Sequence, residues 1–240
     1  MSTLLEDAVH AHGGLENWKR IHSASAELDI GGAIWSVKGQ PDMFRNIKLD
    51  VNLRTQHVAM TSLAGGWKSD FTPEHVRIES LHGGTVEERH APRTAFVGHT
   101  QMTPWDRLHA LYFCSYALWS YLTIPFLYTY PGFHTEELPE WRENGEVWRR
   151  LKSRLPDSIV GHSREQVSYF GDDGLLRRHD YTVDVMGGAP GANYASDYRN
   201  VGGILVPMSR RVFAYGDAGQ TISDPLLVSI DFQAIDWHFD

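Results

Sequence analysis

The centre of this 240-residue chain holds a stretch from Leu108 to Thr135 without a single aspartate, glutamate, lysine or arginine. Such a stretch is long enough to span a membrane, for which about 20 apolar residues suffice. Hydroxyl and histidine side chains within it, and the prolines at 125 and 131, argue against that interpretation. A helix that is apolar nearly all round and does not span a membrane is a buried helix. We therefore predict a buried helical segment over residues 103–135 and no stable insertion into a membrane.

Helix start signals occur at two places. Thr103 and Pro104 have the residue types of an N-cap and a first helical position, with Asp106 in the first turn. Near the beginning of the chain, Thr3 and Glu6 form the spacing of a capping box, and a glycine pair ends the pattern soon after. The predicted helical parts are the short N-terminal helices within residues 1–22 and the central segment.

The rest of the chain shows the alternation of apolar and polar residues that is typical of strands with one buried face. The alternation extends over residues 23–98 and 145–240, and Asp173-Gly174 is a hairpin signal. Because the strands follow one another without long helices between them, an antiparallel sheet is favoured over a parallel one. We predict an α+β, mainly β protein, and no linker divides residues 1–240 into more than one domain.

Composition and missing motifs exclude several classes of function. The 22 basic and 30 acidic residues give a net charge of −8, which argues against nucleic acid as a partner. Gly187 to Gly191 lacks the lysine of a phosphate-binding loop and is interpreted as a flexible turn, so we expect no cofactor. The histidines lack metal-ligand spacing, so we expect no metal. A single cysteine, Cys114, and acidic residues near the start predict a cytoplasmic protein.

One face of the central helix is unusually aromatic. Large side chains with polar tips recur there at helical spacing, and a buried ring of this kind needs a partner for its polar atom. The face belongs either to an ordinary core or to the wall of a cavity, in which case its rings contact a ligand. Its members are Trp105, His109, Tyr112, Tyr116 and Trp119.

The strand after Gly174 places charged and polar groups on its more apolar face. Alternation puts Arg177, His179 and Tyr181 on that face. Such groups, if buried, either form a structural network or contact a ligand. His179 and Tyr181, with His109 of the helix, are candidate acid–base groups, and Arg177 is suited to hold a carboxylate. Tyr194, in the predicted loop that follows, is a further candidate contact.

Three stretches of the chain together resemble, distantly, the superfamily of lipoprotein-localisation factors of the LolA, LolB and LppX type. The resemblance implies a strongly curved antiparallel sheet, a half-open barrel, with helices over its mouth and a hydrophobic ligand between them. The chain differs from those carriers, because no signal peptide and no lipobox cysteine stand near its start. The stretches are Ala11-His12-Gly13-Gly14 with Trp18 and Ile21, the run from Tyr169 to Leu176, and Gly203 to Pro207 followed by Arg210-Arg211.

Two classes of function follow from these observations. The first is binding of a hydrophobic or aromatic small molecule in a cavity between the curved sheet and the helices. The second is a cofactor-independent isomerase, lyase or hydrolase that uses the histidines and Tyr181 in the same cavity. A third interpretation, a structural domain whose interior is filled by side chains, needs no ligand at all.

Overall fold

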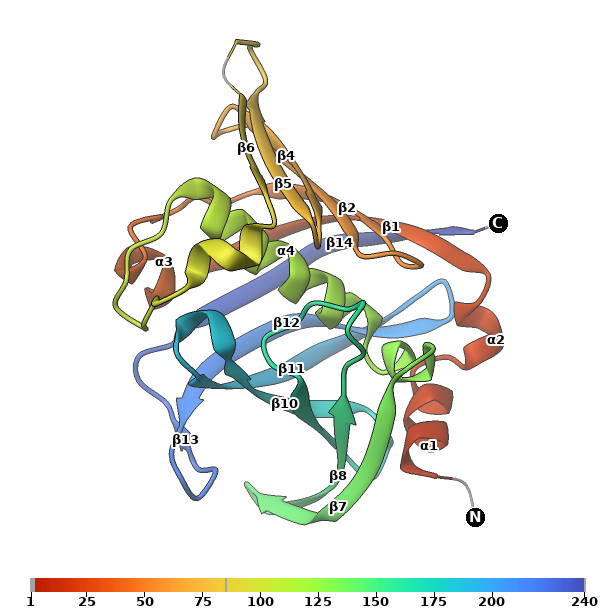
Figure 1. Ribbon diagram of the computed structural model, residues 1–240. Helices are drawn as coiled ribbons and strands as arrows, with labels where there is room; N and C mark the ends of the chain where they lie inside the picture. The colour runs from red at the N-terminus through yellow and green to blue at the C-terminus, as the bar shows by residue number, and fades with distance from the viewer. Residues whose placement is uncertain (1–2, 85, 240) are drawn as a thin grey trace.

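The computed structural model describes residues 3–84 and 86–239. Its main feature is a long, strongly curved antiparallel sheet that wraps around one buried helix (Figure 1). The strand order is β6-β5-β4-β3-β2-β1-β14-β12-β11-β10-β9-β8-β7, with β13 paired to β12 beside this path. The predicted fold class, a half-open barrel around a central helix with a short helical N-terminus, is confirmed.

The elements divide into two runs of strands with α4 between them in the chain. The strands of the first run are β1 (Ile21–Gly31), β2 (Ile47–Asn52), β3 (His57–Ser62), β4 (Trp67–Thr72), β5 (His75–Ser80) and β6 (Val86–His90). Those of the second are β7 (His134–Glu143), β8 (Glu146–Arg154), β9 (Glu165–Phe170), β10 (Leu176–Val183), β11 (Ala189–Val201), β12 (Ile204–Tyr215), β13 (Thr221–Ile222) and β14 (Val228–Phe239). The helices are α1 (Leu4–Ala11), α2 (Leu15–Trp18), α3 (Ala33–Val37) and α4 (Arg107–Thr123), with short 3-10 turns η1 (Pro92–Phe96), η2 (Phe126–Thr129) and η3 (Asp184–Met186).

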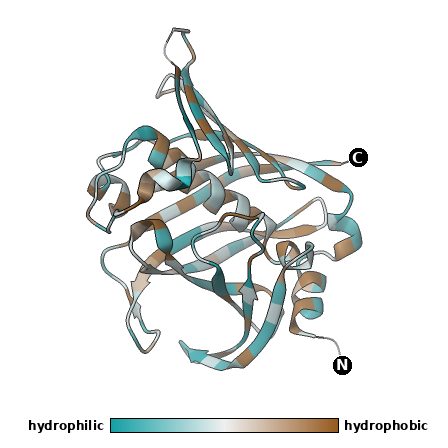
Figure 2. Cartoon of the chain, viewed as in Figure 1, coloured by the Kyte–Doolittle hydropathy of each residue, from teal (hydrophilic) through white to brown (hydrophobic). Residues whose placement is uncertain are grey.

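The first and last strands hold the two runs together. β1 pairs with β14 from Ile21 opposite Phe239 to Gly31 opposite Ser229, and its other edge pairs with β2. The sheet is therefore continuous from β6 to β7 although the chain leaves it to form α4. Along several strands, hydrophilic and hydrophobic residues alternate, as Figure 2 shows. β2 follows this rule, with buried and outward-facing residues in strict succession.

Helix α4 lies on the concave side of the sheet, between the strands of the two runs (Figure 1). From Leu108 to Thr123 every residue except His109 is buried, which confirms the predicted buried helix. Its N-cap is Asp106, whose side chain accepts a hydrogen bond from the backbone N–H of His109. The helix start predicted at Thr103 is wrong. The segment before Asp106 is a loop, in which the backbone carbonyls of Thr100, Gln101 and Thr103 accept hydrogen bonds from the Lys38 ammonium. Among the described residues, no helix has the length and hydropathy needed to cross a membrane.

Two other boundaries differ from the sequence prediction. Gly187 to Gly191 is only in part a turn: β11 begins at Ala189 and includes Tyr194, which was predicted to lie in a loop. Gly191 lies inside β11, and the position requires a glycine because the ring of Tyr181 packs against it. An added Cβ would be 2.6 Å from a carbon of that ring. β7 begins at His134, within the predicted helical segment, and its alternation is weak because most of this edge strand is exposed.

The junction between β1 and α3 depends on a glycine. Gly32 has a φ of +110°, and a Cβ there would be 2.3 Å from the carbonyl oxygen of Leu227. Gly39, which follows α3, has a φ of +74° and nothing within 4 Å of the added carbon.

We expect Gly32→Ala to lower the unfolding free energy by more than about 2 kcal/mol, because it adds a backbone clash to dihedral strain.

The matched variant Gly39→Ala retains only the dihedral strain and is expected to cost about 1 kcal/mol. Urea unfolding of both variants and the wild type, followed by circular dichroism, measures the two values. Equal losses in the two variants would contradict the role of the Leu227 contact.

Candidate functional site

A cavity of about 330 Å³ lies between α4 and the second run of strands. Its walls come from α3 and α4 on one side and from β10, β11, β12 and β14 on the other. Among the described residues, no aspartate, glutamate, lysine, arginine or histidine lines it. The residues that line its middle include Trp35, Phe113, Cys114, Ala117, Leu118, Val183, Val212 and Ile230.

The cavity lies on the side of α4 that carries two small residues between larger ones. Cys114 and Ala117 face it, whereas the other side of the helix carries large rings that fill the space beneath the first run of strands. Tyr112 packs edge-on against Phe71 of β4, with ring centroids 5.6 Å apart. Trp119 donates hydrogen bonds from its indole N–H to backbone carbonyls near the end of β2. One half of the interior is therefore packed and the other half is open.

Apolar side chains surround the mouth of the cavity. Met102 is 72% exposed, Ile222 50% and Val37 43%, although all three also line the cavity. Lys38 stabilises the loop that carries Met102. Its Nζ lies 3.0, 2.7 and 3.1 Å from the carbonyl oxygens of Thr100, Gln101 and Thr103. Burial lowers the pKa of the Lys38 ammonium to about 8. Sequence reasoning missed Lys38, because its position in a short amphipathic stretch is also typical of a solvated lysine.

The inner end of the cavity is closed by two tyrosines. Tyr121 of α4 and Tyr181 of β10 both line it, and their hydroxyl oxygens are 2.7 Å apart. The Tyr121 hydroxyl also lies 3.0 Å from Nε2 of His162, and Nδ1 of His162 lies 3.3 Å from the Tyr116 hydroxyl. Burial raises the pKa of Tyr121 to about 12 and lowers the pKa of His162 well below its usual value. The four side chains therefore form a neutral chain of hydrogen bonds that ends at the cavity.

Two buried polar side chains lie beside this end without full hydrogen bonding. Nη2 of Arg210 donates to the backbone carbonyl of Tyr121 at 2.8 Å, but Nη1 has no partner among the described residues. Asn193 interacts with the Tyr121 hydroxyl, but neither of its side-chain polar atoms makes a hydrogen bond of good geometry with a described residue. Both residues are fully or almost fully buried, and the salt bridges of the described residues do not include Arg210. Burial lowers the pKa of Arg210.

Of the residues proposed from sequence, only Tyr181 lines the cavity. The interior placement of Arg177 is wrong, because the register of β10 against β9 shifts between Leu176 and Arg178. This bulge turns Arg177 outward to Asp173, and the Leu176 side chain enters the core instead. Sequence alternation cannot detect a shift of this kind, because one extra residue reverses the faces of everything before it.

The other candidates lie away from the cavity. His179 contacts Ser168 and Gln166 through its two ring nitrogens, and burial lowers its pKa to about 3. His109 packs on Phe96 with its Nδ1 2.8 Å from Asp106. Trp105, Tyr112, Tyr116 and Trp119 belong to the packed side of α4 or to the cluster around its first turn. The aromatic face is thus placed in the core rather than along the cavity.

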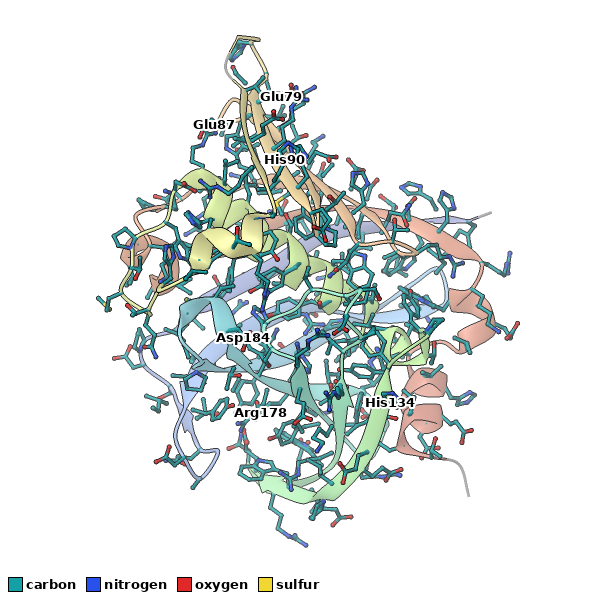
Figure 3. All side chains as sticks on the ribbon, viewed as in Figure 1. Glu79, Glu87, His90, His134, Arg178 and Asp184 are labelled. Atoms are coloured by element: carbon teal, nitrogen blue, oxygen red, sulfur yellow. The ribbon has the colours of Figure 1, made fainter. Side chains whose placement is uncertain are left out.

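Tyr194 points to the opposite face of the sheet. There it contacts Glu143, Thr221 and Arg178, the last of which is labelled in Figure 3. Arg178 is fully buried between the carboxylates of Asp180 and Glu143, at 2.6 and 2.7 Å. This arginine is therefore fully paired, unlike Arg210. Among residues 3–84 and 86–239, no three histidine, cysteine or acidic side chains group so as to hold a metal ion.

No protein-family model and no curated protein matches the chain in sequence. Solved structures do match its fold. A DUF1329 family protein from Desulfovibrio piger is 11% identical with a TM-score of 0.57, over 98% of this chain and 91% of that one. A LolA superfamily protein from Nitrosomonas europaea is 8% identical with a TM-score of 0.51, over 98% and 92%.

A domain from Vibrio parahaemolyticus named for outer membrane lipoprotein sorting is 10% identical with a TM-score of 0.52, over 98% and 92% of the two chains. The resemblance to the LolA superfamily is thus confirmed at the level of the fold. The predicted cytoplasmic location is contradicted by this comparison, in which one structure with the same fold is named for outer membrane lipoprotein sorting.

Buried histidines make the stability of the fold depend on pH. Burial lowers the pKa of His12 to about 4 and that of His179 to about 3, from an unfolded value near 6.5. The unfolded chain therefore binds more protons than the folded one in the range between these values. The contribution of these histidines to the unfolding free energy is fully present above pH 6.5. It is lost as the pH falls, by up to about 1.4 kcal/mol per histidine and pH unit.

We expect urea unfolding at pH 5 to give an unfolding free energy lower than at pH 7 by at least about 2 kcal/mol. In His179→Gln this difference should shrink, whereas the exposed His134→Gln should keep the wild-type difference. A pH dependence that is the same in all three proteins would contradict the assignment.

Proposed function

We propose that this protein binds one small hydrophobic molecule in the cavity between α4 and the second run of strands. The observation that carries the proposal is an apolar cavity that reaches the surface at Met102, Val37 and Ile222 and is lined by no charged side chain of the part of the chain that the structure describes. Buried apolar surface is the main source of binding free energy for such a ligand, at about 25 cal/mol per Å². The hydroxyls of Tyr121 and Tyr181 at the inner end of the cavity are polar groups that can orient it.

The cavity volume restricts the size of the ligand. Its 330 Å³ lies at the lower end of the roughly 300–1,000 Å³ of sites that bind small molecules. A single aliphatic chain or a compact ring system suits this volume better than a lipid with several acyl chains. Two of the proteins with this fold are named for the LolA superfamily and for lipoprotein sorting. Those names support a hydrophobic ligand here as well.

Catalysis in this cavity has less support than binding. Of the three candidate acid–base groups, His109 and His179 have partners in the core and do not line the cavity. Tyr181 does line it, but burial raises its pKa well above its usual value, so it keeps its proton at neutral pH. An acid–base role for these residues stays a prediction from the sequence.

Filling the cavity from the helix side tests the proposal. Ala117 lines the cavity, and Ala117→Leu adds three carbon atoms to the space that the ligand would occupy. We expect its affinity for the neutral fluorophore N-phenyl-1-naphthylamine to fall at least about tenfold, which corresponds to 1.4 kcal/mol. Fluorescence titration measures this affinity.

The control variant is Ala59→Leu, which makes the same change in β3, where Ala59 alternates with the buried Val58 and Met60 and is only partly buried. It should bind the fluorophore as the wild type does. If the wild type does not bind the fluorophore, or if Ala117→Leu binds it as tightly as the wild type, the cavity is not the binding site.

A further inference from the structure

The two fully buried cations of the sheet differ in a way that points to the ligand. Arg178 is paired with two carboxylates, whereas Arg210 has no salt bridge among those of the described residues. A buried charge is costly unless it is paired, and a cation whose carboxylate partner is absent is suited to an anion that arrives with a ligand.

Part of the role of Arg210 is structural. Pro125 has no backbone N–H, so the Tyr121 carbonyl near the end of α4 lacks its usual donor from the fourth residue onward. Nη2 of Arg210 supplies this hydrogen bond, and a cation is favourable at the C-terminus of a helix. This contact accounts for one nitrogen of the guanidinium and leaves Nη1 without a partner.

Arg210 lies next to the inner end of the cavity. Ile230, which is opposite Arg210 on β14, and Val212, which follows on the same face of β12, both line the cavity. On its remaining side the guanidinium faces the ring of Tyr121, 4.9 Å from the centroid. Asn193, opposite Val212 on β11, adds to the same patch a second polar group without a hydrogen bond of good geometry to a described residue.

The hydrogen-bond chain leads to the same place. Tyr181 has only the Tyr121 hydroxyl among its hydrogen-bond partners in the described residues, so one position on its oxygen is free. An acceptor in the cavity would orient the chain so that Tyr116 donates to His162, His162 to Tyr121, and Tyr121 to Tyr181. Tyr181 would then donate a hydrogen bond to the acceptor.

We propose that the ligand of this cavity is an apolar carboxylic acid, whose carboxylate binds at the Tyr121–Tyr181 end with Arg210 as its counter-ion. This inference rests on the proposed function and adds the head group of the ligand. The apolar part lies along Ala117 and Leu118 toward the mouth, and the carboxylate accepts from Tyr181. Arg210 and Asn193 do not line the cavity, and the Arg210 guanidinium lies over the ring of Tyr121, so Arg210 acts on the carboxylate through its charge rather than by a direct hydrogen bond.

Matched ligands separate the head group from the apolar part. Palmitic acid and its methyl ester have the same chain and differ in charge, and each is titrated against bound N-phenyl-1-naphthylamine at pH 7.5. We expect the wild type to prefer the acid by at least about tenfold. In Arg210→Met this preference should fall to about one, whereas Arg210→Lys should keep part of it.

The outcomes distinguish the two proposals. If the acid and the ester displace the fluorophore equally well from the wild type, the cavity binds hydrophobic molecules but the head-group assignment is wrong. If the fluorophore does not bind at all, the proposed function itself fails. Should Arg210→Met not fold, Tyr181→Phe replaces it, because loss of the donated hydrogen bond must also lower the preference for the acid. An unchanged preference in that variant would overturn the inference.

Discussion

Helix α4 is buried along nearly its whole length, so the sheet must curve around it to cover both of its sides. A flat sheet would leave one side of this uncharged helix in water, at a cost proportional to the apolar area exposed. The pairing of β1 with β14 makes the curved cover continuous by joining strands from the two ends of the chain. The sizes of the side chains on α4 then determine which half of the interior is full. Tyr112 and Trp119 fill one half, and Ala117 leaves room in the other.

Three buried cations illustrate how differently a charge can be accommodated in one fold. Lys38 donates to three backbone carbonyls and thereby fixes the loop at the cavity mouth. Arg178 is neutralised by two carboxylates on the far face of the sheet. Arg210 has a helix carbonyl and aromatic rings around it, but no carboxylate among its contacts in the described residues. It is also the one next to the inner end of the cavity, which is why its missing counter-ion bears on the ligand.

Much of the fold was predictable because it depends on local patterns. The capping box at Thr3 and Glu6, the hairpin near Gly174 and the alternation in the strands all have direct physical causes within a few residues. The site was predicted less well. A bulge in β10 removed Arg177 from the interior, and the aromatic face of α4 is placed on the packed side rather than toward the cavity. The first is an error and the second decides between two alternatives that the sequence left open; both concern which way a face points, which depends on partners distant in the chain.

By itself, the sequence determined that an uncharged central helix must be buried and that antiparallel strands must cover it, because both follow from hydropathy and period along the chain. Only the tertiary structure decided which side of the helix is open, since that depends on the volumes of side chains that meet from separate strands. It also decided that Arg210, and not Arg177, lies beside the cavity. Whether a charge has a partner is a property of three-dimensional neighbours, and sequence spacing contains no information about it.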